Sequence, residues 1–494
     1  MKINFNKNKQ HINQNILSML YKNFVIFVIC TLMLACGNAQ DNVEQRLLDI
    51  DDSLMFVPVD TSYSFIRYDS NHLILPADSS LMRLFAEKWY RMLATGEGHI
   101  NIVQMGASHV QGGSLPHRVR YNLLTPLPNL VAARGLIFPY SAAVKCNNPY
   151  DYKVSRTRPL TLTRCVYKEP AERLGLCGIA VTAADEPADI GITLNEPEIN
   201  FASTTVTLFG EARGGVEPYL TIVDRDGDSV ALRPVSVDKQ LRRYTFEMPC
   251  AVDSFHIVMP CTVGQSFAIT GVYLDNGAPG ISFHSIGVNG ASLVEYISKM
   301  PYFTADLQMV KPDLVIFGIG INDASGANFD TSVFIRRYMR LVDSIRSVSP
   351  DCAFLFLTNN DSFRRSGRNY IVNDNGPIAR EAFIRLGQMT GGAVWDQFTV
   401  MGGLGSMGTW QNNELAQRDH IHFTRKGYQL LADLMSNALF ETLVQLKPAH
   451  LTAQPDKASP AQDDRRLYKK RSRRGSRTTQ DKSTDNERPD YIHY

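Results

Sequence analysis

The sequence predicts an α/β protein in which a parallel sheet is covered by helices and interrupted by an all-β segment. Two observations lead to this prediction. Buried-type apolar strands alternate with amphipathic helical stretches before about residue 150 and again after residue 277. Between them, short alternating strands are separated by Gly- and Asp-rich turns, which is typical of a β-sandwich. The length of 494 residues is sufficient for two or three domains.

The first α/β part, residues 40–150, contains a strand that ends at a serine. Apolar side chains recur at helical spacing over residues 79–93, and a second helix is expected over residues 115–124. Between them, the apolar strand 102–106 enters a Gly-Ala-Ser turn that ends at Ser108. This order places the Ser108 hydroxyl at the C-terminal edge of a sheet, close to the positive end of a helix. A helix N-cap is the alternative role for such a serine.

The all-β segment, residues 151–276, is expected to be an inserted β-sandwich. Its strands are expected at 160–166, 178–182, 190–194, 204–209, 219–223, 244–248, 254–258 and 268–274. The Asp-rich turn 224–228 is interpreted as a solvated hairpin tip, because it lacks the helical frame and terminal Glu of a calcium-binding EF-hand. Tyr219 and Tyr244 are candidates for a sugar platform, although tyrosines in strands are more often packing residues.

The second α/β part, residues 277–446, repeats the strand-then-polar-turn pattern. Strands are expected at 281–286, 313–317, 353–357 and 393–395, and helices at 331–348, 377–389 and 425–443. Polar turns follow the strands, and ligands of parallel sheets gather at the C-terminal strand edge. The functional residues are therefore expected in these turns.

Composition and cysteines limit the partners. The net charge of +2 predicts no nucleic-acid partner. There is no CxxC and no His/Cys cluster at metal-ligand spacing, so no structural zinc is expected. No other metal and no cofactor are expected either. In an oxidising compartment, Cys165/Cys177 and Cys250/Cys261 are candidate disulfides between neighbouring strands, and Cys352 is expected to be a buried free thiol.

The two ends are interpreted as segments outside the fold. Residues 1–39 combine lysines with the short apolar run 24–35, which is typical of a signal peptide. The run Leu-Ala-Cys-Gly resembles a lipobox that would leave Cys36 acylated; cleavage before Gln40 and a retained membrane anchor are the alternatives. Each places the body outside the cytoplasm, in the periplasm or on the outer membrane of a bacterium. Residues 447–494 are expected to be a disordered basic tail.

The polar turns together contain the groups that acyl transfer needs. His422 is a candidate base for the Ser108 hydroxyl, and Asp419, three residues earlier, is placed to orient its ring. A tetrahedral intermediate also needs hydrogen-bond donors. The candidates are the backbone N–H groups of Ser108 and Gly290 and the side-chain amide of Asn322.

These residues resemble the four blocks of the SGNH (GDSL-type) hydrolase family. The blocks are Gly106-Ala107-Ser108, Gly290, Gly320-Ile321-Asn322-Asp323 and Asp419-His420-Ile421-His422. The resemblance implies a flavodoxin-like three-layer α/β/α fold and an esterase that uses a Ser-His-Asp triad. Ala107 departs from the family's usual Asp, which is not one of its catalytic residues. Gly287 competes with Gly290 for the second block, and His420 competes with His422, although only His422 has the family's spacing from Asp419.

The position of the insertion resembles the periplasmic peptidoglycan O-acetylesterases of this family, whose inserted domain looks like a carbohydrate-binding module. The resemblance implies removal of O-acetyl groups from a glycan. His109, Asp323, Asp361 and Trp410 are candidate substrate-binding residues. The alternatives are a glycan O-acyltransferase that uses the same site, a non-catalytic glycan-binding lipoprotein, and an esterase that acts on lipid. The sequence gives no oligomeric state.

Overall fold

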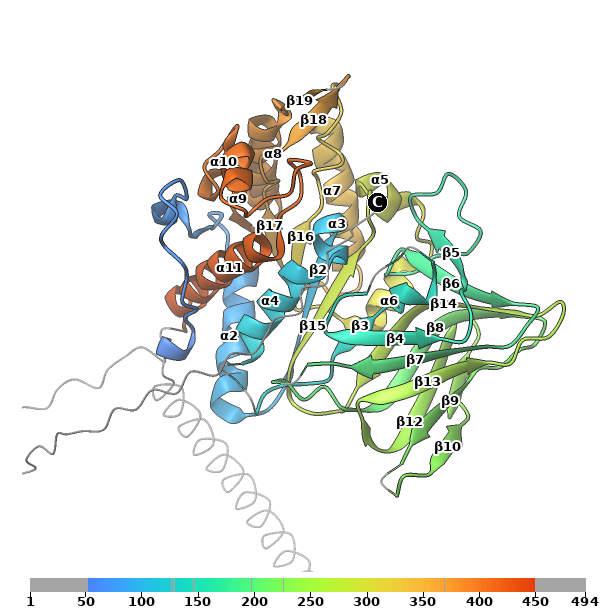
Figure 1. The fold of residues 1–494 in the computed structure, drawn as a ribbon. Helices are drawn as coiled ribbons and strands as arrows, with labels where there is room; N and C mark the ends of the chain where they lie inside the picture. The colour runs from blue at the N-terminus through green and yellow to red at the C-terminus, as the bar shows by residue number, and fades with distance from the viewer. Residues whose placement is uncertain are drawn as a thin grey trace, which may run out of the picture. The chain divides into compact units, whose positions relative to one another are not determined.

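The α/β part is built on a six-stranded sheet with the order β1-β20-β17-β16-β2-β15 (Figure 1). The computed structural model describes residues 52–448, apart from residues 126, 128, 145, 147, 197, 225 and 368. The predicted signal peptide with Cys36, and the tail after residue 448, lie outside the described residues. The strands are β1 (Leu73–Ile74), β2 (His99–Gly106), β15 (Gly280–Gly287), β16 (Leu314–Gly318), β17 (Ala353–Leu357) and β20 (Ala393–Trp395). All are parallel except β1, which pairs antiparallel with β20.

Ten α-helices join and pack against these strands in the described part of the chain, which also contains the short 3-10 helices Asp52–Leu54, Tyr68–Ser70 and Tyr140–Ala142. The α-helices are α2 (Ser80–Thr95), α3 (Ser108–Gln111), α4 (Ser114–Leu124), α5 (Leu293–Ser298), α6 (Phe303–Val310), α7 (Thr331–Arg346), α8 (Asn375–Thr390), α9 (Gln397–Val400), α10 (Ser406–Asn412) and α11 (Arg425–Gln445). The helix α4 packs on α11, and α7 packs on α5 and α8. Side-chain hydrogen bonds to free backbone N–H groups fix the first residue of two of these helices, α7 and α11. The Asp330 side chain accepts the N–H groups of Ser332 and Val333 at the start of α7, and Thr424 accepts the N–H of Gly427 at the start of α11.

The all-β part consists of two antiparallel sheets. One has the order β10-β9-β13-β7-β4, and the other has the order β11-β12-β8-β14-β6-β5, with β3 also paired to β14. The strands are β3 (Gly135–Ile137), β4 (Tyr152–Arg156), β5 (Thr161–Arg164), β6 (Ile179–Ala184), β7 (Ala188–Leu194), β8 (Ser203–Arg213), β9 (Tyr219–Val223), β10 (Ser229–Leu232), β11 (Ser236–Asp238), β12 (Arg243–Val252), β13 (Ser254–Met259) and β14 (Ser266–Asp275). Buried and exposed residues alternate along β12 and β13, as expected for strands with one face in a core.

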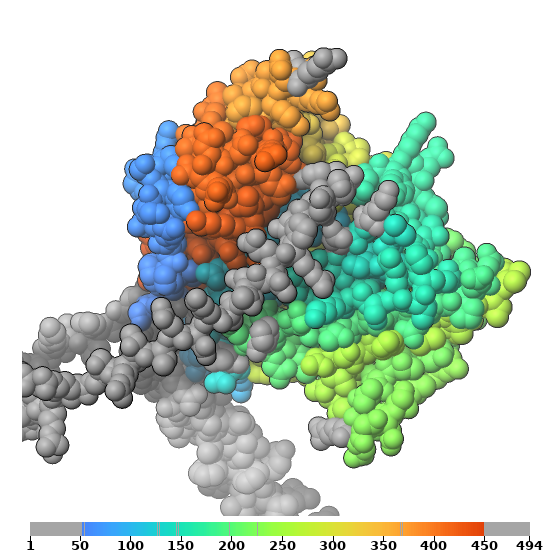
Figure 2. All heavy atoms as spheres, viewed as in Figure 1, coloured from blue at the N-terminus to red at the C-terminus, as the bar shows by residue number. Residues whose placement is uncertain are grey.

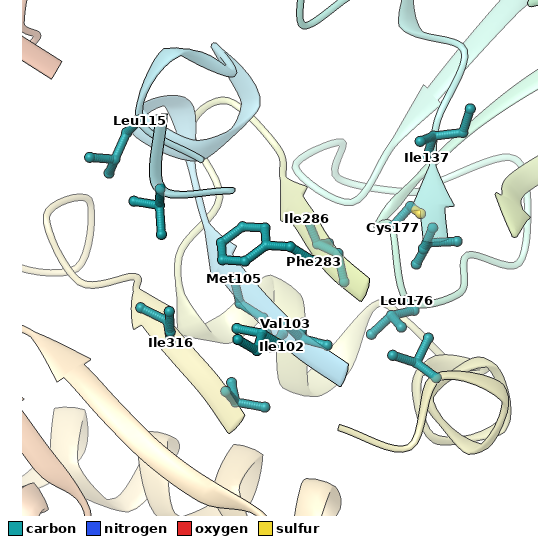
Figure 3. Packing of buried hydrophobic residues seen from close by; sticks show 14 of the residues in the cluster. Ile102, Val103, Met105, Leu115, Ile137, Leu176, Cys177, Phe283, Ile286 and Ile316 are labelled. Carbon is teal, nitrogen blue, oxygen red and sulfur yellow. The ribbon is translucent and has the colours of Figure 1, made fainter. Parts of the chain in front are cut away.

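One hydrophobic core extends through the α/β part and the all-β part. Figure 3 shows Phe283 and Ile286 of β15 near Ile137 of β3 and Cys177, with Met105 of β2 on their other side. All these side chains are buried. Residues of both parts also form the surface drawn in Figure 2, where the all-β part is teal to yellow-green and the C-terminal helices are orange. No helix among the described residues is long and apolar enough to cross a membrane.

The structure contains every predicted strand and helix, with ends shifted by a few residues, and adds others. The extra elements include α6, the edge strands β1, β10 and β11, and the hairpin of β18 (Phe363–Ser366) and β19 (Asn369–Val372). The Asp-rich turn is the tip of the β9–β10 hairpin, as predicted. Tyr244 is buried against Phe267, which supports its packing role.

The predicted disulfides are absent, because Cys165, Cys177, Cys250 and Cys261 are all free thiols. The backbone partner of Cys165 is Gly178 rather than Cys177, since Cys165 N–H donates to the Gly178 carbonyl. Cys177 lies in the turn before β6, and the Cys165 sulfur packs against Gly178, 3.4 Å from the position of an added Cβ. The thiol of Cys261 donates instead to the Ala183 carbonyl. Cys352 is a buried free thiol, as predicted.

Candidate active site

Ser108 is the first residue of α3 and follows β2 after a single residue. Two glycines make this sharp turn sterically possible. A Cβ added at Gly106 would lie 2.3 Å from Val110 Cγ2, and one at Gly287 would lie 2.5 Å from the backbone nitrogen of Gln111. Because both positions lack a side chain, α3 folds back onto the ends of β2 and β15. Ser108 is therefore held at the C-terminal edge of the sheet.

The loop before α11 brings His422 and Asp419 to this serine. His422 Nε2 lies 2.7 Å from Ser108 Oγ, and His422 Nδ1 lies 2.7 Å from Asp419 Oδ2. An ionised carboxylate only accepts hydrogen bonds, so Nδ1–H donates to Asp419 and Nε2 of the neutral ring accepts from the serine hydroxyl. The structure thus joins the three predicted residues in one hydrogen-bonded chain.

Asp419 is fixed by its own backbone as well as by the histidine. Its Oδ1 accepts the N–H of Ile421 at 2.9 Å and the N–H of His422 at 3.0 Å. Burial raises the pKa of Asp419, but hydrogen bonds from the His422 ring and from these N–H groups outweigh burial and lower the pKa to about 2. The carboxylate therefore stays ionised at neutral pH and holds the ring in one orientation.

The three predicted oxyanion donors lie on neighbouring strand ends. Ser108 N–H and Gly290 N–H donate to no acceptor within the described residues. Asn322 follows β16, and its Nδ2 donates to the Ala291 carbonyl at 2.9 Å, which leaves the second N–H of this amide for another acceptor. Asn289 N–H donates to Gln111 Oε1 at 2.6 Å, so the Gly290 segment is tied to the helix that begins at Ser108.

The structure distinguishes Gly290 from Gly287 as the glycine of the second block, and His422 from His420 as the histidine beside Ser108. Gly287 is the end of β15 and packs under α3, whereas Gly290 has a φ of +81° and nothing within 4 Å of an added Cβ. Gly290 is therefore required for its left-handed backbone and faces open space. His420 stacks on Phe363 with ring centroids 4.5 Å apart, while His422 contacts Ser108.

His109 and Asp323, predicted as substrate contacts, lie beside the site but are engaged within the protein. His109 Nδ1 is 2.8 Å from the Tyr428 hydroxyl, and its ring centroid is 5.1 Å from that of His422. Burial, followed by the neighbouring His422, lowers the pKa of His109 to about 3, so this ring is neutral. Asp323 accepts the Leu293 N–H at the start of α5, and burial raises the pKa of Asp323 to about 6.

Asp361 and Trp410 were predicted to contact the substrate, but the structure places both in the core. Both are 0% exposed. Asp361 Oδ2 accepts the N–H of Met407 in α10, and burial raises the pKa of this carboxyl. Trp410 Nε1 donates to the Met401 carbonyl, and its ring packs edge-on against Phe423. Each side chain satisfies internal backbone groups rather than facing a ligand.

A cavity of about 30 Å³ lies next to His109 and is lined in part by Thr358, Asn360 and Tyr428. This volume is far below that of a sugar-binding pocket. The cavity is therefore too small to hold a sugar ring.

Two residues around the Gly290 segment were not predicted from the sequence. Gln111 is 6% exposed and accepts the Asn289 N–H. Arg164 comes from β5 of the all-β part, and its Nη2 donates to the Asn289 carbonyl. The sequence offers no signal for Arg164, because 125 residues separate the two partners.

Comparison with known proteins relates the sequence and the fold of this chain to acylhydrolases and esterases. Residues 268–430 match the GDSL-like lipase/acylhydrolase family, whereas no curated protein sequence matches the chain significantly. A peptidoglycan O-acetylesterase structure is similar at a TM-score of 0.59 and 21% identity, over 78% of this chain and 99% of that chain. A family two carbohydrate esterase from Cellvibrio japonicus is similar at a TM-score of only 0.25 and 11% identity, over 60% of this chain and 98% of that chain. The family match over residues 268–430 and the fold shared with the O-acetylesterase confirm the resemblance to GDSL-type hydrolases.

Proposed function

We propose that the protein is a serine esterase that removes O-acetyl groups from a glycan. The observation that carries this proposal is the hydrogen-bonded chain from Ser108 Oγ through His422 to Asp419, with 2.7 Å at each step. This arrangement matches the Ser-His-Asp constellation that activates a serine as nucleophile.

The proposed reaction has two acyl-transfer steps. His422 takes the proton of Ser108 as the serine oxygen attacks the ester carbonyl, and the resulting oxyanion accepts hydrogen bonds from Ser108 N–H, Gly290 N–H and Asn322. The tetrahedral intermediate expels the sugar hydroxyl, which leaves with the proton from His422. Water, deprotonated by His422, then attacks the acetyl-enzyme, and acetate leaves as Ser108 regains its proton.

The glycan substrate is proposed from the relatives. The family match supports acyl hydrolysis, and the structurally similar proteins include a peptidoglycan O-acetylesterase. We take O-acetylated peptidoglycan as the first substrate to test.

The domain organisation is part of the same proposal. Residues 40–150 and 277–446 form one hydrolase domain, with helices on both faces of its parallel sheet in a flavodoxin-like three-layer arrangement. Residues 151–276 form an inserted β-sandwich that resembles a carbohydrate-binding module. The two antiparallel sheets support this division, because all their strands except β3 lie within residues 151–276.

Export is proposed from the N-terminal sequence. The lysine-rich, apolar start and the Leu-Ala-Cys-Gly run support secretion with a lipid on Cys36. Fractionation of cells that produce the full chain or its Cys36→Ser variant tests this proposal. The full chain should be found with membranes and the variant in the soluble periplasmic fraction; a cytoplasmic full chain would contradict export.

The first experiment is hydrolysis of p-nitrophenyl acetate by the full chain and by its Ser108→Ala variant. The variant should lose on the order of ten-thousandfold or more in kcat, because the nucleophile is gone. Acetate release from O-acetylated peptidoglycan and from acetylated xylan then distinguishes the glycans. Equal activity in the two folded proteins would refute the serine mechanism. If the folded full chain is inert, the esterase proposal fails.

A further inference from the structure

The Gly290 segment, residues 289–291, is held by side chains from three separate parts of the chain. Gln111 of α3 accepts the Asn289 N–H, Arg164 of β5 donates to the Asn289 carbonyl, and Asn322 donates to the Ala291 carbonyl. Two of these three residues belong to the α/β part. Arg164 is the exception, because it comes from the all-β part.

The contact of Arg164 is chemically specific, because the carbonyl of Asn289 and the N–H of Gly290 belong to the same peptide group. A trans peptide is planar, and its C=O and N–H bonds point in opposite directions. A guanidinium bound to the oxygen therefore fixes the direction in which the Gly290 N–H points. The charge-assisted hydrogen bond also polarises the peptide and makes its N–H a stronger donor.

Arg164 lies inside this junction. Its Nε is buried and has no hydrogen-bond partner among the described residues, and its guanidinium lies near the Cys146 thiol. Gln111 Nε2 donates to the sulfur of Cys146. Gly178 of the all-β part also lies against Val288 of the α/β part, because a Cβ added at Gly178 would be only 3.1 Å from Val288 Cγ2. The all-β part thus packs directly against Val288, the residue before Asn289.

We infer that Arg164 is a positioning residue that aims and polarises the Gly290 N–H, so that the all-β part completes the oxyanion site of the α/β part. This inference rests on the proposed esterase function. It assigns the all-β part a role in the chemical step, in addition to the glycan binding proposed for it.

The test measures kcat and KM for p-nitrophenyl acetate in full-length Arg164→Met and Arg164→Lys variants. The oxyanion exists only in the transition state, so Arg164→Met should lower kcat by on the order of tenfold to a hundredfold and leave KM nearly unchanged. Arg164→Lys keeps the charge and one donor, and should recover part of this loss. Phenylboronic acid, which forms a tetrahedral anionic adduct with an active serine, should bind more weakly to Arg164→Met by a similar factor.

Lys299→Met is the matched control. Lys299 Nζ also donates to a backbone carbonyl across this junction, that of Tyr167, at 2.6 Å. The control should retain wild-type kcat, because its partner is not the Gly290 peptide.

Two results would overturn the inference: wild-type kcat in folded Arg164→Met, or equal losses of kcat in Arg164→Met and Lys299→Met. If Arg164→Met does not fold, the kcat of Arg164→Lys and Arg164→Gln decides, and wild-type values in both overturn it. Inactivity of the wild type would instead refute the esterase proposal itself.

Discussion

Asp419 uses its two carboxylate oxygens for different tasks, and this division predicts the effect of an amide. Oδ1 accepts two backbone N–H groups and Oδ2 accepts the His422 ring. In Asp419→Asn, the amide oxygen can stay on the backbone, but the NH₂ group then faces His422 and forces its proton onto Nε2. The ring can no longer accept the Ser108 proton, so kcat should fall on the order of a thousandfold or more with little change in KM.

Asp330→Asn is the matched control for this measurement. Asp330 Oδ1 also accepts two backbone N–H groups, at 2.8 and 3.0 Å, but its role is to cap α7. Asn caps a helix about as well as Asp, so the control should keep both stability and activity. Near-normal turnover of p-nitrophenyl acetate by Asp419→Asn would show that this carboxylate does not set the tautomer.

Single residues were predictable from the sequence where their neighbours in the chain determine their contacts. Asp419 and His422 are three residues apart, and a local turn brings them together. Trp410 and Asp361 were misassigned because polar and aromatic residues near a predicted cleft look alike in sequence, whether they face solvent or the core. Arg164 was not predicted because its partner lies on another strand, far along the chain.

The turn that follows β15 leads to a prediction about stability and activity, because its conformation depends on one glycine. Gly290 has a φ of +81° and Gly96, which ends α2, has a φ of +68°; neither has an atom within 4 Å of an added Cβ. Alanine at either position should cost about 1–2 kcal/mol of stability, because only the backbone conformation is unfavourable. In Gly290→Ala the turn that carries the proposed oxyanion donor is also disturbed, so kcat should fall on the order of tenfold or more.

Gly96→Ala should keep wild-type kcat, since Gly96 precedes the N-terminal end of β2, at the opposite end of that strand from Ser108. Urea unfolding and p-nitrophenyl acetate kinetics on both variants separate strain from function. Equal activities in the two variants would remove Gly290 from the proposed oxyanion site.

Long elements were predicted better than short ones for a physical reason. The buried strands β16 and β17 and the amphipathic helix α7 carry their own apolar pattern. The two-residue strand β1 is defined by its pairing with β20, more than 300 residues later in the chain. The edge strands β10 and β11 have little buried surface, so they carry only a weak apolar pattern.

At the scale of the whole molecule, the junction between α/β and all-β parts includes a carboxylate that is buried at an energetic cost. Asp306 of α6 is 0% exposed, and its Oδ2 accepts the N–H of Leu176 at 2.9 Å. Burial raises the pKa of Asp306 to about 6, from an ordinary value of 3.8. The sequence could predict neither this contact nor the shared core, because both depend on how the two parts pack.

The raised pKa of Asp306 sets a pH window for stability. Between pH 3.8 and about 6 the unfolded chain has released a proton that the folded chain retains, so stability falls as the pH rises through this window. Above pH 6 the destabilisation is complete, and below pH 3.8 it is absent. An uncharged Asn can still accept the Leu176 N–H, so Asp306→Asn should match the wild type near pH 3.5. At pH 7.5 the variant should be more stable, by at most about 3 kcal/mol. Urea unfolding at both pH values measures the difference in the free energy of unfolding. A variant that is less stable than the wild type at pH 7.5 would contradict the prediction. It would show that the buried, ionised Asp306 is stabilised by the nearby charge of Arg242.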